Sequence, residues 1–213
     1  MKWTYWAVAG MALGSVTLAC NNDPGAGKPR ATAAQPVEVA KTPAPGAAVE
    51  YEFNGQDSTL AFVGAKVTGQ HEGSFKTFSG SVRLVDHTPE LSSVKVDIEM
   101  ASVQVEPAKL AGHLKSPDFF DVAKYPKATF ESTSVKPGGT NGATHTVTGN
   151  LTLHGTTRSI SFPAKIQVSG DNVRVNAEFA INRKDFGIVY PGMPDDLIND
   201  SVLIQLNLGA NRS

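Results

Sequence analysis

The stretch SISFPAKIQVSGDNVRVNAEFAIN (residues 159–182) is the clearest indication of the fold class of this chain. Apolar and polar side chains alternate through each of its halves, as they do in a β-strand with one apolar face and one wet face. Gly170, Asp171 and Asn172 separate the two runs with residues that are typical of a turn. The stretch therefore predicts two strands, each with a single apolar face.

The same period of two continues through most of the chain after Glu50, and helical periodicity is nearly absent there. The alternation is clear in two further runs and weaker in four others, which are residues 94–100, 201–208, 60–67, 78–85, 128–135 and 144–154. About eight antiparallel strands without a long covering helix can hide their apolar faces in a sandwich or in a closed barrel. We favour an all-β, lipocalin-like barrel of eight antiparallel strands. Alternation alone does not decide whether side chains fill its interior or leave room for one apolar ligand.

The exception to the alternation is EPAKLAGHLKSPDFFDVAKYP (residues 106–126). Pro107 is suited to open one short helix, and Ser116 followed by Pro117 has the pattern of an N-cap and first helical residue of a second. We expect both helices to lie near one mouth of the barrel, with Phe119 and Phe120 providing the apolar cover. The alternative is that both rings simply complete the core.

Composition limits the classes of function. The chain has 213 residues, of which 40% are hydrophobic, and this suits one sizeable core rather than a large multidomain enzyme. Nineteen Lys and Arg stand against 20 Asp and Glu, so the chain lacks the basic surface that nucleic acid binding needs. The single cysteine, Cys20, excludes an internal disulfide and a thiolate metal cluster.

The start of the chain has the pattern of an export signal. In residues 1–19 Lys2 precedes an apolar run that ends in small residues before Cys20. This pattern resembles a bacterial lipoprotein signal, which implies cleavage before Cys20 and acylation of that residue. We therefore expect an exported protein of the periplasm or cell envelope, held to the membrane through Cys20. The alternatives are an uncleaved helical anchor and ordinary secretion with a free thiol.

Residues 20–49 are rich in Pro, Ala and Gly and contain no aromatic residue. Such a composition buries too little apolar surface to order itself, so it predicts a disordered tether. The predicted barrel domain then occupies residues 50–213.

Three longer motifs resemble the YceI-like, polyisoprenoid-binding family. They are HLKSPDFFDVAKYPKATFESTSV (residues 113–135), GNLTLHGTTRSISF (149–162) and INRKDFGI (181–188). The resemblance implies an extended lipocalin-like barrel outside the cytoplasm, with a long apolar cavity that holds an isoprenoid or related amphiphilic lipid.

Within such a barrel, the expected lipid-binding residues are apolar side chains that point inward or lie near the closed end. They are Phe62, Val96, Ile98, Phe119, Phe120, Phe130, Leu151, Leu153, Phe179 and Ile181. A polar head group would stay near a mouth, and the candidates for contact with it are Lys66, His71, His154 and Arg183. For each of these residues a structural role is the alternative.

The sequence contains no pattern that favours catalysis. The five histidines lack HxH and HExxH spacing, and no GxSxG motif is present. Asp195 and Asp196 are best interpreted as part of a Pro/Gly turn. We therefore predict no metal site, no cofactor and no enzymatic activity, and leave the oligomeric state open. The predicted function is lipid binding for carriage or storage. The alternative is a structural or interaction protein of the envelope with a packed barrel.

Overall fold

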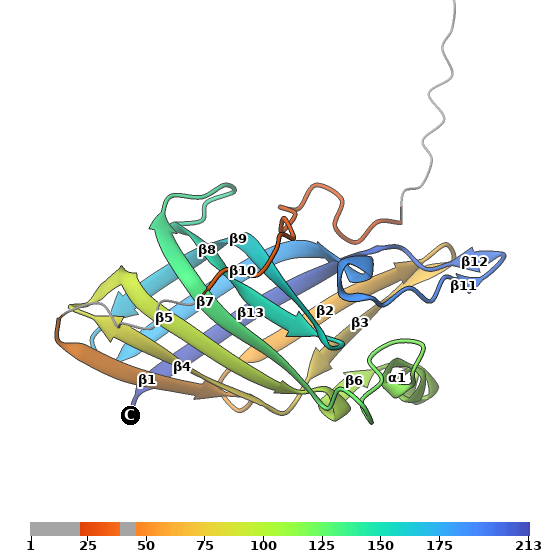
Figure 1. The fold of residues 1–213 in the computed structure, drawn as a ribbon, viewed down its shortest axis with the longest axis horizontal. Coiled ribbons are helices and arrows are strands. Elements are labelled where there is room, and N and C mark those ends of the chain that lie inside the picture. Colours follow the sequence, from red (N-terminus) through yellow and green to blue (C-terminus); the bar gives the residue numbers. More distant parts are fainter. Residues whose placement is uncertain (1–21, 39–45) are drawn as a thin grey trace, which may run out of the picture.

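The computed structural model describes residues 22–38 and 46–213. The predicted export signal (residues 1–19) and acylation site (Cys20) lie outside the described residues. The described chain consists almost entirely of strands, with one α-helix and two short 3-10 helices, η1 and η2 (Figure 1). In chain order the elements are β1 (Ala48–Asn54), β2 (Thr59–Lys66), β3 (Gly69–Phe75), β4 (Phe78–Val85), β5 (Thr88–Glu99), η1 (Met100–Ser102), β6 (Val103–Val105), α1 (Ala108–Lys115), β7 (Lys127–Pro137), β8 (His145–Leu153), β9 (Thr156–Ser169), β10 (Asn172–Asn182), η2 (Arg183–Phe186), β11 (Gly192–Met193), β12 (Asp196–Leu197) and β13 (Ser201–Arg212).

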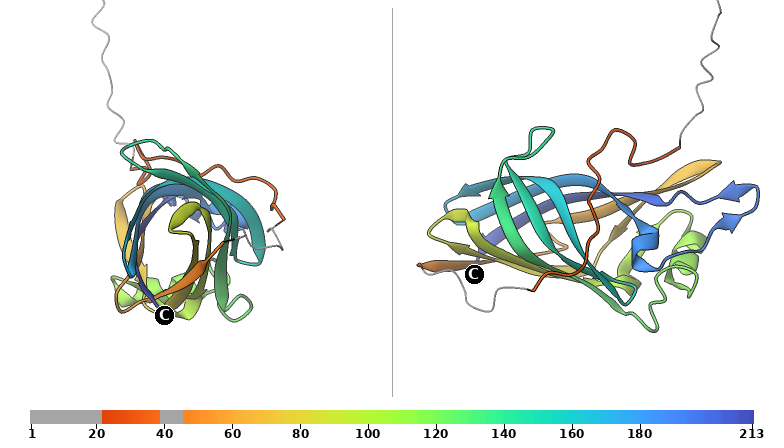
Figure 2. Two further views of the ribbon diagram at one scale, coloured as in Figure 1. Left: turned by 90° about the vertical axis from the view of Figure 1, so that its left-hand side faces the viewer. Right: turned by 45° about the horizontal axis from the view of Figure 1, so that its top comes forward.

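The strands close into an antiparallel barrel, as the alternation predicts. Around the wall the order runs from β1 through β4, β5, β7, β8, β9 and β10 to β13, and β13 also pairs with β1 and β2. β2 continues the line of β1 along the wall after a short interruption, and β4 continues β3 and β6 continues β5 in the same way. Each of these three couples counts as one strand of the wall, so the 11 strands of the sheet form a barrel of eight. Figure 2 shows this ring of strands from one end. Closure leaves every apolar face of the main sheet directed inward, which fixes where the core lies.

Three strands of the main sheet were absent from the expectations drawn from the sequence: β1, β3 and β6. In β1, Val49, Tyr51 and Phe53 alternate with two glutamates, so the pattern was present. In β3 the sequence GQHEGSF is polar and carries two glycines, and it has no apolar periodicity to detect. Each missed strand continues one that was expected, and the count of eight is therefore confirmed.

One of the two expected helices is absent. The helix α1 begins directly after Pro107, as predicted, but the residues after Ser116 form turns. Ser116 ends α1 instead of starting a second helix, because its N–H and its hydroxyl both donate to the carbonyl of His113. Asp121 then has a φ of 46°, in the left-handed region, and this conformation is incompatible with a continuing right-handed helix.

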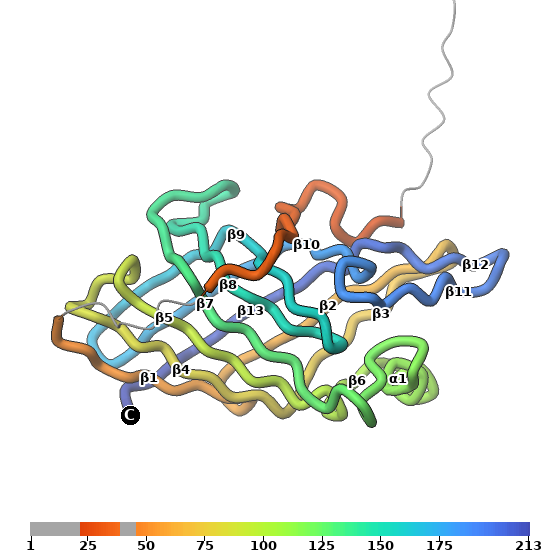
Figure 3. Tube along the Cα trace, in the orientation of Figure 1, coloured from red at the N-terminus to blue at the C-terminus, as the bar shows by residue number. Residues whose placement is uncertain are grey.

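The wall of the barrel has an opening between β9 and β10. These strands pair only near their connecting turn, as far as Lys165 and Asn176, and then separate. Residues 29–34 lie in the opening and form isolated bridges, parallel to β10 at Ala180 and antiparallel to β9 at Ser159. Figure 3 shows the N-terminal segment, residues 22–38, crossing the outside of the barrel at this place.

Four backbone hydrogen bonds hold the N-terminal segment in the opening. The N–H of Ala31 donates to the carbonyl of Ala180, and the N–H of Ala180 donates to Pro29, both at 2.8 Å. The N–H of Ala34 donates to the carbonyl of Ser159 at 2.8 Å, and the N–H of Ser159 donates to the carbonyl of Ala34 at 3.0 Å. The segment therefore satisfies backbone groups that β9 and β10 leave unpaired.

Side chains fix the beginning of the same segment. A Cβ on Gly25 would lie 2.5 Å from the Ser201 hydroxyl, so only glycine allows this close approach. Burial favours the neutral form of the Asp23 carboxyl. Hydrogen bonds from the Gly25 N–H, the Ser201 hydroxyl and the Arg30 guanidinium outweigh burial and lower the pKa of Asp23. Residues 22–38 thus follow a defined path where composition predicts a disordered tether, because the opening in the wall supplies partners that composition does not reveal.

The bonds of the N-terminal segment give a first prediction. Proline at position 34 (Ala34→Pro) removes the donor to Ser159, and we expect local opening at Ser159 and Ala180 to increase by about fivefold to tenfold. Amide hydrogen exchange at these two residues measures it. The matched control is Thr32→Pro, because the Thr32 N–H makes no hydrogen bond in the described structure. Equal exchange in the two variants would contradict a role for the Ala34 bond.

Candidate functional site

The barrel encloses a cavity of about 850 Å³. Its wall is formed mainly by apolar side chains that point inward from β2, β5, β7, β9, β10 and β13. A cavity of this size shows that side chains do not fill the barrel, so the packed-barrel alternative does not describe this interior. The volume lies in the upper part of the range of ~300–1,000 Å³ that is usual for small-molecule sites.

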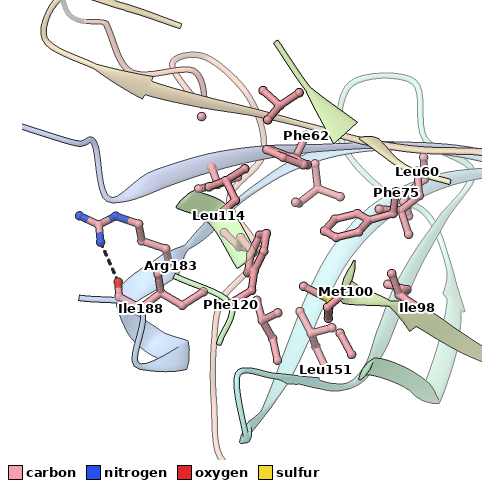
Figure 4. A pocket seen from close by; sticks show the side chains of 18 of the residues that line it. Leu60, Phe62, Phe75, Ile98, Met100, Leu114, Phe120, Leu151, Arg183 and Ile188 are labelled. Carbon is pink, nitrogen blue, oxygen red and sulfur yellow. Dashed lines mark hydrogen bonds between the residues drawn. The ribbon is translucent and has the colours of Figure 1, made fainter. Parts of the chain in front are cut away.

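All ten apolar residues that the sequence selected as lipid contacts border the cavity. Eight come from five strands, and two follow α1: they are Phe62 on β2, Val96 and Ile98 on β5, Phe130 on β7, Leu151 and Leu153 on β8, Phe179 and Ile181 on β10, and Phe119 and Phe120. Figure 4 shows Phe62, Ile98 and Phe120 directed toward one another from different elements. The inward placement of the eight strand residues follows from strand parity, since alternate residues of a strand share one face.

Aromatic rings stiffen the lining in two places. Phe162 stacks on Phe179 with 4.2 Å between ring centroids, and Phe130 lies 5.8 Å from Phe162. Nearer the helix, the rings of Phe75 and Phe120 are 5.8 Å apart. Contacts between rings restrict their rotation, so the rings give these parts of the cavity a defined shape.

Glycines on neighbouring strands make room for two of the rings. A Cβ on Gly73 would lie 2.3 Å from the ring of Phe62, which is its partner across β2 and β3. A Cβ on Gly149 would lie 2.4 Å from the ring of Phe130. The sequence contained these glycines but no local signal for their role, because each ring lies on a different strand.

The turns after α1 close part of the cavity. Leu114 is buried, and the ring of Phe119 lies 4.9 Å from His113 and 5.4 Å from Tyr190. Phe120 packs against the same core. The sequence offered cavity cover and core packing as alternatives for the two phenylalanines, and the structure shows both, since the rings border the cavity and belong to the core.

Polar side chains border the cavity at the end where the turn between β2 and β3 meets the β11–β12 hairpin. Lys66 forms an ion pair with Asp196, and both border the cavity. His71 also borders it, with its Nδ1 3.2 Å from the carbonyl oxygen of Glu106. Lys109 of α1 borders the cavity as well. The structure thus brings Lys66 and His71 together at one end, as expected of head-group contacts.

Arg183 borders the cavity too, but its donors are occupied by the protein. Its Nε donates to the carbonyl of Asn199 at 3.0 Å, and its Nη1 donates to the carbonyl of Ile188 at 2.7 Å (Figure 4). Its Nη2 donates to the Ile198 carbonyl and to the Asp200 carboxylate. Burial lowers the pKa of Arg183, and Asp200 opposes this effect. The side chain therefore holds the segment before β13 to the barrel.

His154 is not among the residues that border the cavity. It lies in the turn between β8 and β9, where its ring packs 4.8 Å from that of Tyr125. Its Nδ1 lies 3.3 Å from the carbonyl oxygen of Phe186. The turn directs this side chain toward η2 and Tyr125. The structure therefore does not place His154 with the other head-group candidates.

The described residues, 22–38 and 46–213, offer neither a metal-binding cluster nor a membrane-spanning helix. No three His, Cys, Asp or Glu side chains in this part of the chain are grouped so that they could hold a metal ion. No helix in the same residues has the length and apolar character needed to cross a bilayer.

Comparison with known proteins identifies the family. A family model described as the YceI-like domain matches residues 51–210, which span the barrel from β1 to β13. The chain belongs to the YceI-like family. Membership of this family, which the three sequence motifs led us to expect, is thereby confirmed.

Relatives in the YceI-like family resemble this chain over most of its length. A UPF0312 protein of Pseudomonas putida is 35% identical over 168 residues, covering 74% of this chain and 86% of the relative. Protein YceI of Salmonella arizonae is 37% identical over 153 residues, or 66% of this chain and 77% of the relative.

Solved structures share the YceI-like barrel. BcnA of Burkholderia cenocepacia is 26% identical, with a TM-score of 0.64 over 72% of this chain and 96% of that protein. A domain of Saccharophagus degradans, described as a polyisoprenoid binding domain implicated in plant cell wall breakdown, has a TM-score of 0.61. It covers 78% of this chain and all of that domain, and its 17% identity shows a shared fold alone.

The glycine beneath Phe62 gives a second prediction. Gly73→Ala forces the Phe62 ring to move into the cavity, and we expect the free energy of unfolding to fall by about 1–3 kcal/mol. Urea unfolding measures the change. Gly64→Ala is the matched control on the adjoining strand β2, because a Cβ there meets nothing within 4 Å. A Gly73→Ala variant as stable as Gly64→Ala would show that the ring is not confined.

Asp196 gives a third prediction, on pH. The hydrogen bond from Lys66 lowers the pKa of Asp196; burial opposes this shift, and bonds from the Thr68 N–H and hydroxyl add to it. The pKa of Asp196 in the folded chain lies below its unfolded value of about 3.9. The ionised Asp196 therefore stabilises the folded state above that value, and this stabilisation is lost as the pH falls through the folded pKa.

We therefore expect the β11–β12 hairpin to loosen from the turn between β2 and β3 below about pH 4. The protection factor of the Val67 amide, which donates to Leu197, reports this contact. It should fall several-fold between pH 6 and pH 3, and Asp196→Asn should remove this dependence. If the protection factor in the natural chain stays constant between pH 6 and pH 3, Asp196 does not hold the hairpin to the turn.

Proposed function

We propose that this YceI-like domain binds an isoprenoid or similar amphiphilic lipid, with the apolar tail inside the barrel and the polar head at the mouth near Lys66. The function is carriage or storage of the lipid in the bacterial envelope, without chemical change to it. Export and acylation of Cys20 belong to the same proposal and would hold the protein at the membrane.

The cavity is the observation that carries the proposal. It is lined by apolar side chains over most of the barrel and has polar residues at one end, which matches the distribution of polarity in an amphiphilic lipid. If a carbon group takes ~30 Å³, the share of one water molecule in the liquid, the cavity has room for a chain of roughly 28 carbon groups. This volume suits a tail of several isoprene units rather than a compact metabolite.

Binding energetics favour a long tail as well. Transfer of a CH₂ group from water to an apolar site gains about 0.8 kcal/mol, so one five-carbon unit gains roughly 4 kcal/mol. Association itself costs an estimated 4–15 kcal/mol, which a single unit offsets at best in part. A tail of three or more units supplies the surplus that stable binding requires.

Two polar residues at the mouth are the proposed contacts of the head group. The ammonium of Lys66 and the ring of His71 border the cavity there and suit a phosphate or a quinone oxygen. Arg183 instead acts as a structural residue, because main-chain carbonyls and Asp200 already accept hydrogen bonds from its guanidinium. Family membership and a fold shared with a polyisoprenoid binding domain support the ligand class.

Ligand extraction tests the proposal directly. The protein is purified from its own envelope, examined by native mass spectrometry and extracted with organic solvent. We expect one apolar lipid per barrel. A protein that is repeatedly empty, and that takes up no isoprenoid when one is supplied, would overturn the proposed function.

A cavity-filling substitution gives the fourth prediction. Ile98→Trp extends an inward side chain into the cavity, and we expect uptake of a C15 or longer isoprenoid to fall at least about tenfold, since the tail loses its space. Asp97→Trp places the same side chain on the outer face of β5 and should leave uptake unchanged. Thermal unfolding confirms that both variants fold.

If Ile98→Trp does not fold, Val96→Phe makes a smaller change at the neighbouring inward position. Folded variants of both kinds with full uptake would remove β5 from the binding site.

A further inference from the structure

Exposed apolar side chains gather at one end of the barrel. Among the described residues, four of the six large hydrophobic side chains with high exposure lie on or beside the β11–β12 hairpin and the turn between β2 and β3. Their exposed fractions are 65% for Val67, 63% for Val189, 61% for Met193 and 51% for Leu197. Isolated exposed hydrophobics are ordinary, but a concentration at one end indicates a contact surface.

Hydrogen bonds hold this apolar tip in a fixed shape. The N–H of Val67 donates to the carbonyl of Leu197 at 3.1 Å, and the N–H of Asn199 donates to the carbonyl of Ala65 at 2.8 Å. Asp196 accepts bonds from Thr68 beside these contacts. The turn between β2 and β3 therefore supports the hairpin, and Val67 and Leu197 are presented next to each other.

The apolar tip adjoins the mouth of the cavity. Gly192 and Met193 of the hairpin border the cavity, as does Lys66 at the end of β2. Figure 1 shows β11, β12 and the β2–β3 turn extending together beyond the rest of the barrel. A lipid that enters at this mouth passes between the tip and α1, so whatever surface the tip contacts is also the nearest source of lipid.

The N-terminal segment begins at the same end. The amide of Asn22, the first described residue, donates to the carbonyl of Lys66 at 2.5 Å, and the Gln70 amide donates to Asn22 at 3.0 Å. The described part of the chain therefore enters the domain beside the cavity mouth.

We propose that the tip formed by Val67, Val189, Met193 and Leu197 docks on a lipid bilayer, with the cavity mouth facing the membrane. The inference deepens the proposed lipid-binding function and rests on it. Docking lets a lipid tail move between bilayer and barrel without exposure of its whole length to water.

Charge favours apolar insertion over electrostatic attraction at this surface. The chain has a formal net charge of -1, and Lys66, at the mouth, is already paired with Asp196. A basic patch for anionic lipids is therefore not the basis of docking. We expect the tip to bind zwitterionic phosphatidylcholine vesicles as well as vesicles that contain anionic lipid.

Loading of the barrel from vesicles tests the proposal. In the full chain, Val67→Asp with Leu197→Asp adds two charges to the tip without changing a residue that borders the cavity. We expect loading with a fluorescent farnesol analogue from phosphatidylcholine vesicles to slow at least about tenfold. Binding of the same probe from aqueous solution should not change. The matched control is Val37→Asp with Leu91→Asp, at exposed apolar positions away from the tip.

The two readouts separate docking from lipid binding. A tip variant that loads from vesicles at the natural rate overturns docking, even if the probe binds normally from solution. A natural chain that binds no probe from solution refutes the proposed function. In that case docking is judged by cross-linking alone.

Photo-cross-linking supplies a readout that needs no ligand. Benzoylphenylalanine replaces Leu197, or Leu91 as the control, in the full chain within bacterial envelope membranes. We expect phospholipid adducts from position 197 and none from position 91. Adducts to a protein at position 197, or equal phospholipid labelling at both positions, would overturn the proposal.

Discussion

Each strand of this domain has one apolar face, and the need to remove that face from water is the constraint on which the structure depends. Eight strands meet it by closing into a ring, which directs side chains such as Phe62, Ile98 and Phe179 inward. The ring leaves a cavity, so the surface that stabilises the fold is also the surface available to a lipid tail. Stability and the proposed binding are therefore coupled: a change in the lining is expected to alter both.

The barrel wall is completed by residues outside its regular strands. Where β9 and β10 separate, residues 29–34 provide the hydrogen bonds that Ser159 and Ala180 would otherwise lack. An unpaired, buried backbone group costs free energy, so the N-terminal segment is part of the fold rather than a passive connection. Its path also fixes where the chain enters the domain, at Asn22 beside the cavity mouth. The proposed docking surface and the cavity mouth thus lie at the same end of the molecule.

The rim of that mouth depends on charged residues in structural roles. Arg183 donates to three main-chain carbonyls and to Asp200, and this arrangement secures the segment that carries the β11–β12 hairpin. Asp196 fixes the hairpin to the turn between β2 and β3. Because these charges are satisfied within the protein, the rim can present apolar side chains to its surroundings and keep a defined opening.

The alternation in residues 159–182 was enough to predict two strands, and the same period predicted which side chains of β5 and β10 face inward. Parity along a strand is a local property, so the sequence by itself determined the all-β fold, the inward faces and, through its motifs, the family. The polar strand β3, the opening beside Ser159, the path of residues 22–38 and the exclusion of His154 from the cavity were decided only by the tertiary structure. Each depends on how strands from distant parts of the chain tilt, pair and separate, and no local pattern records those distances.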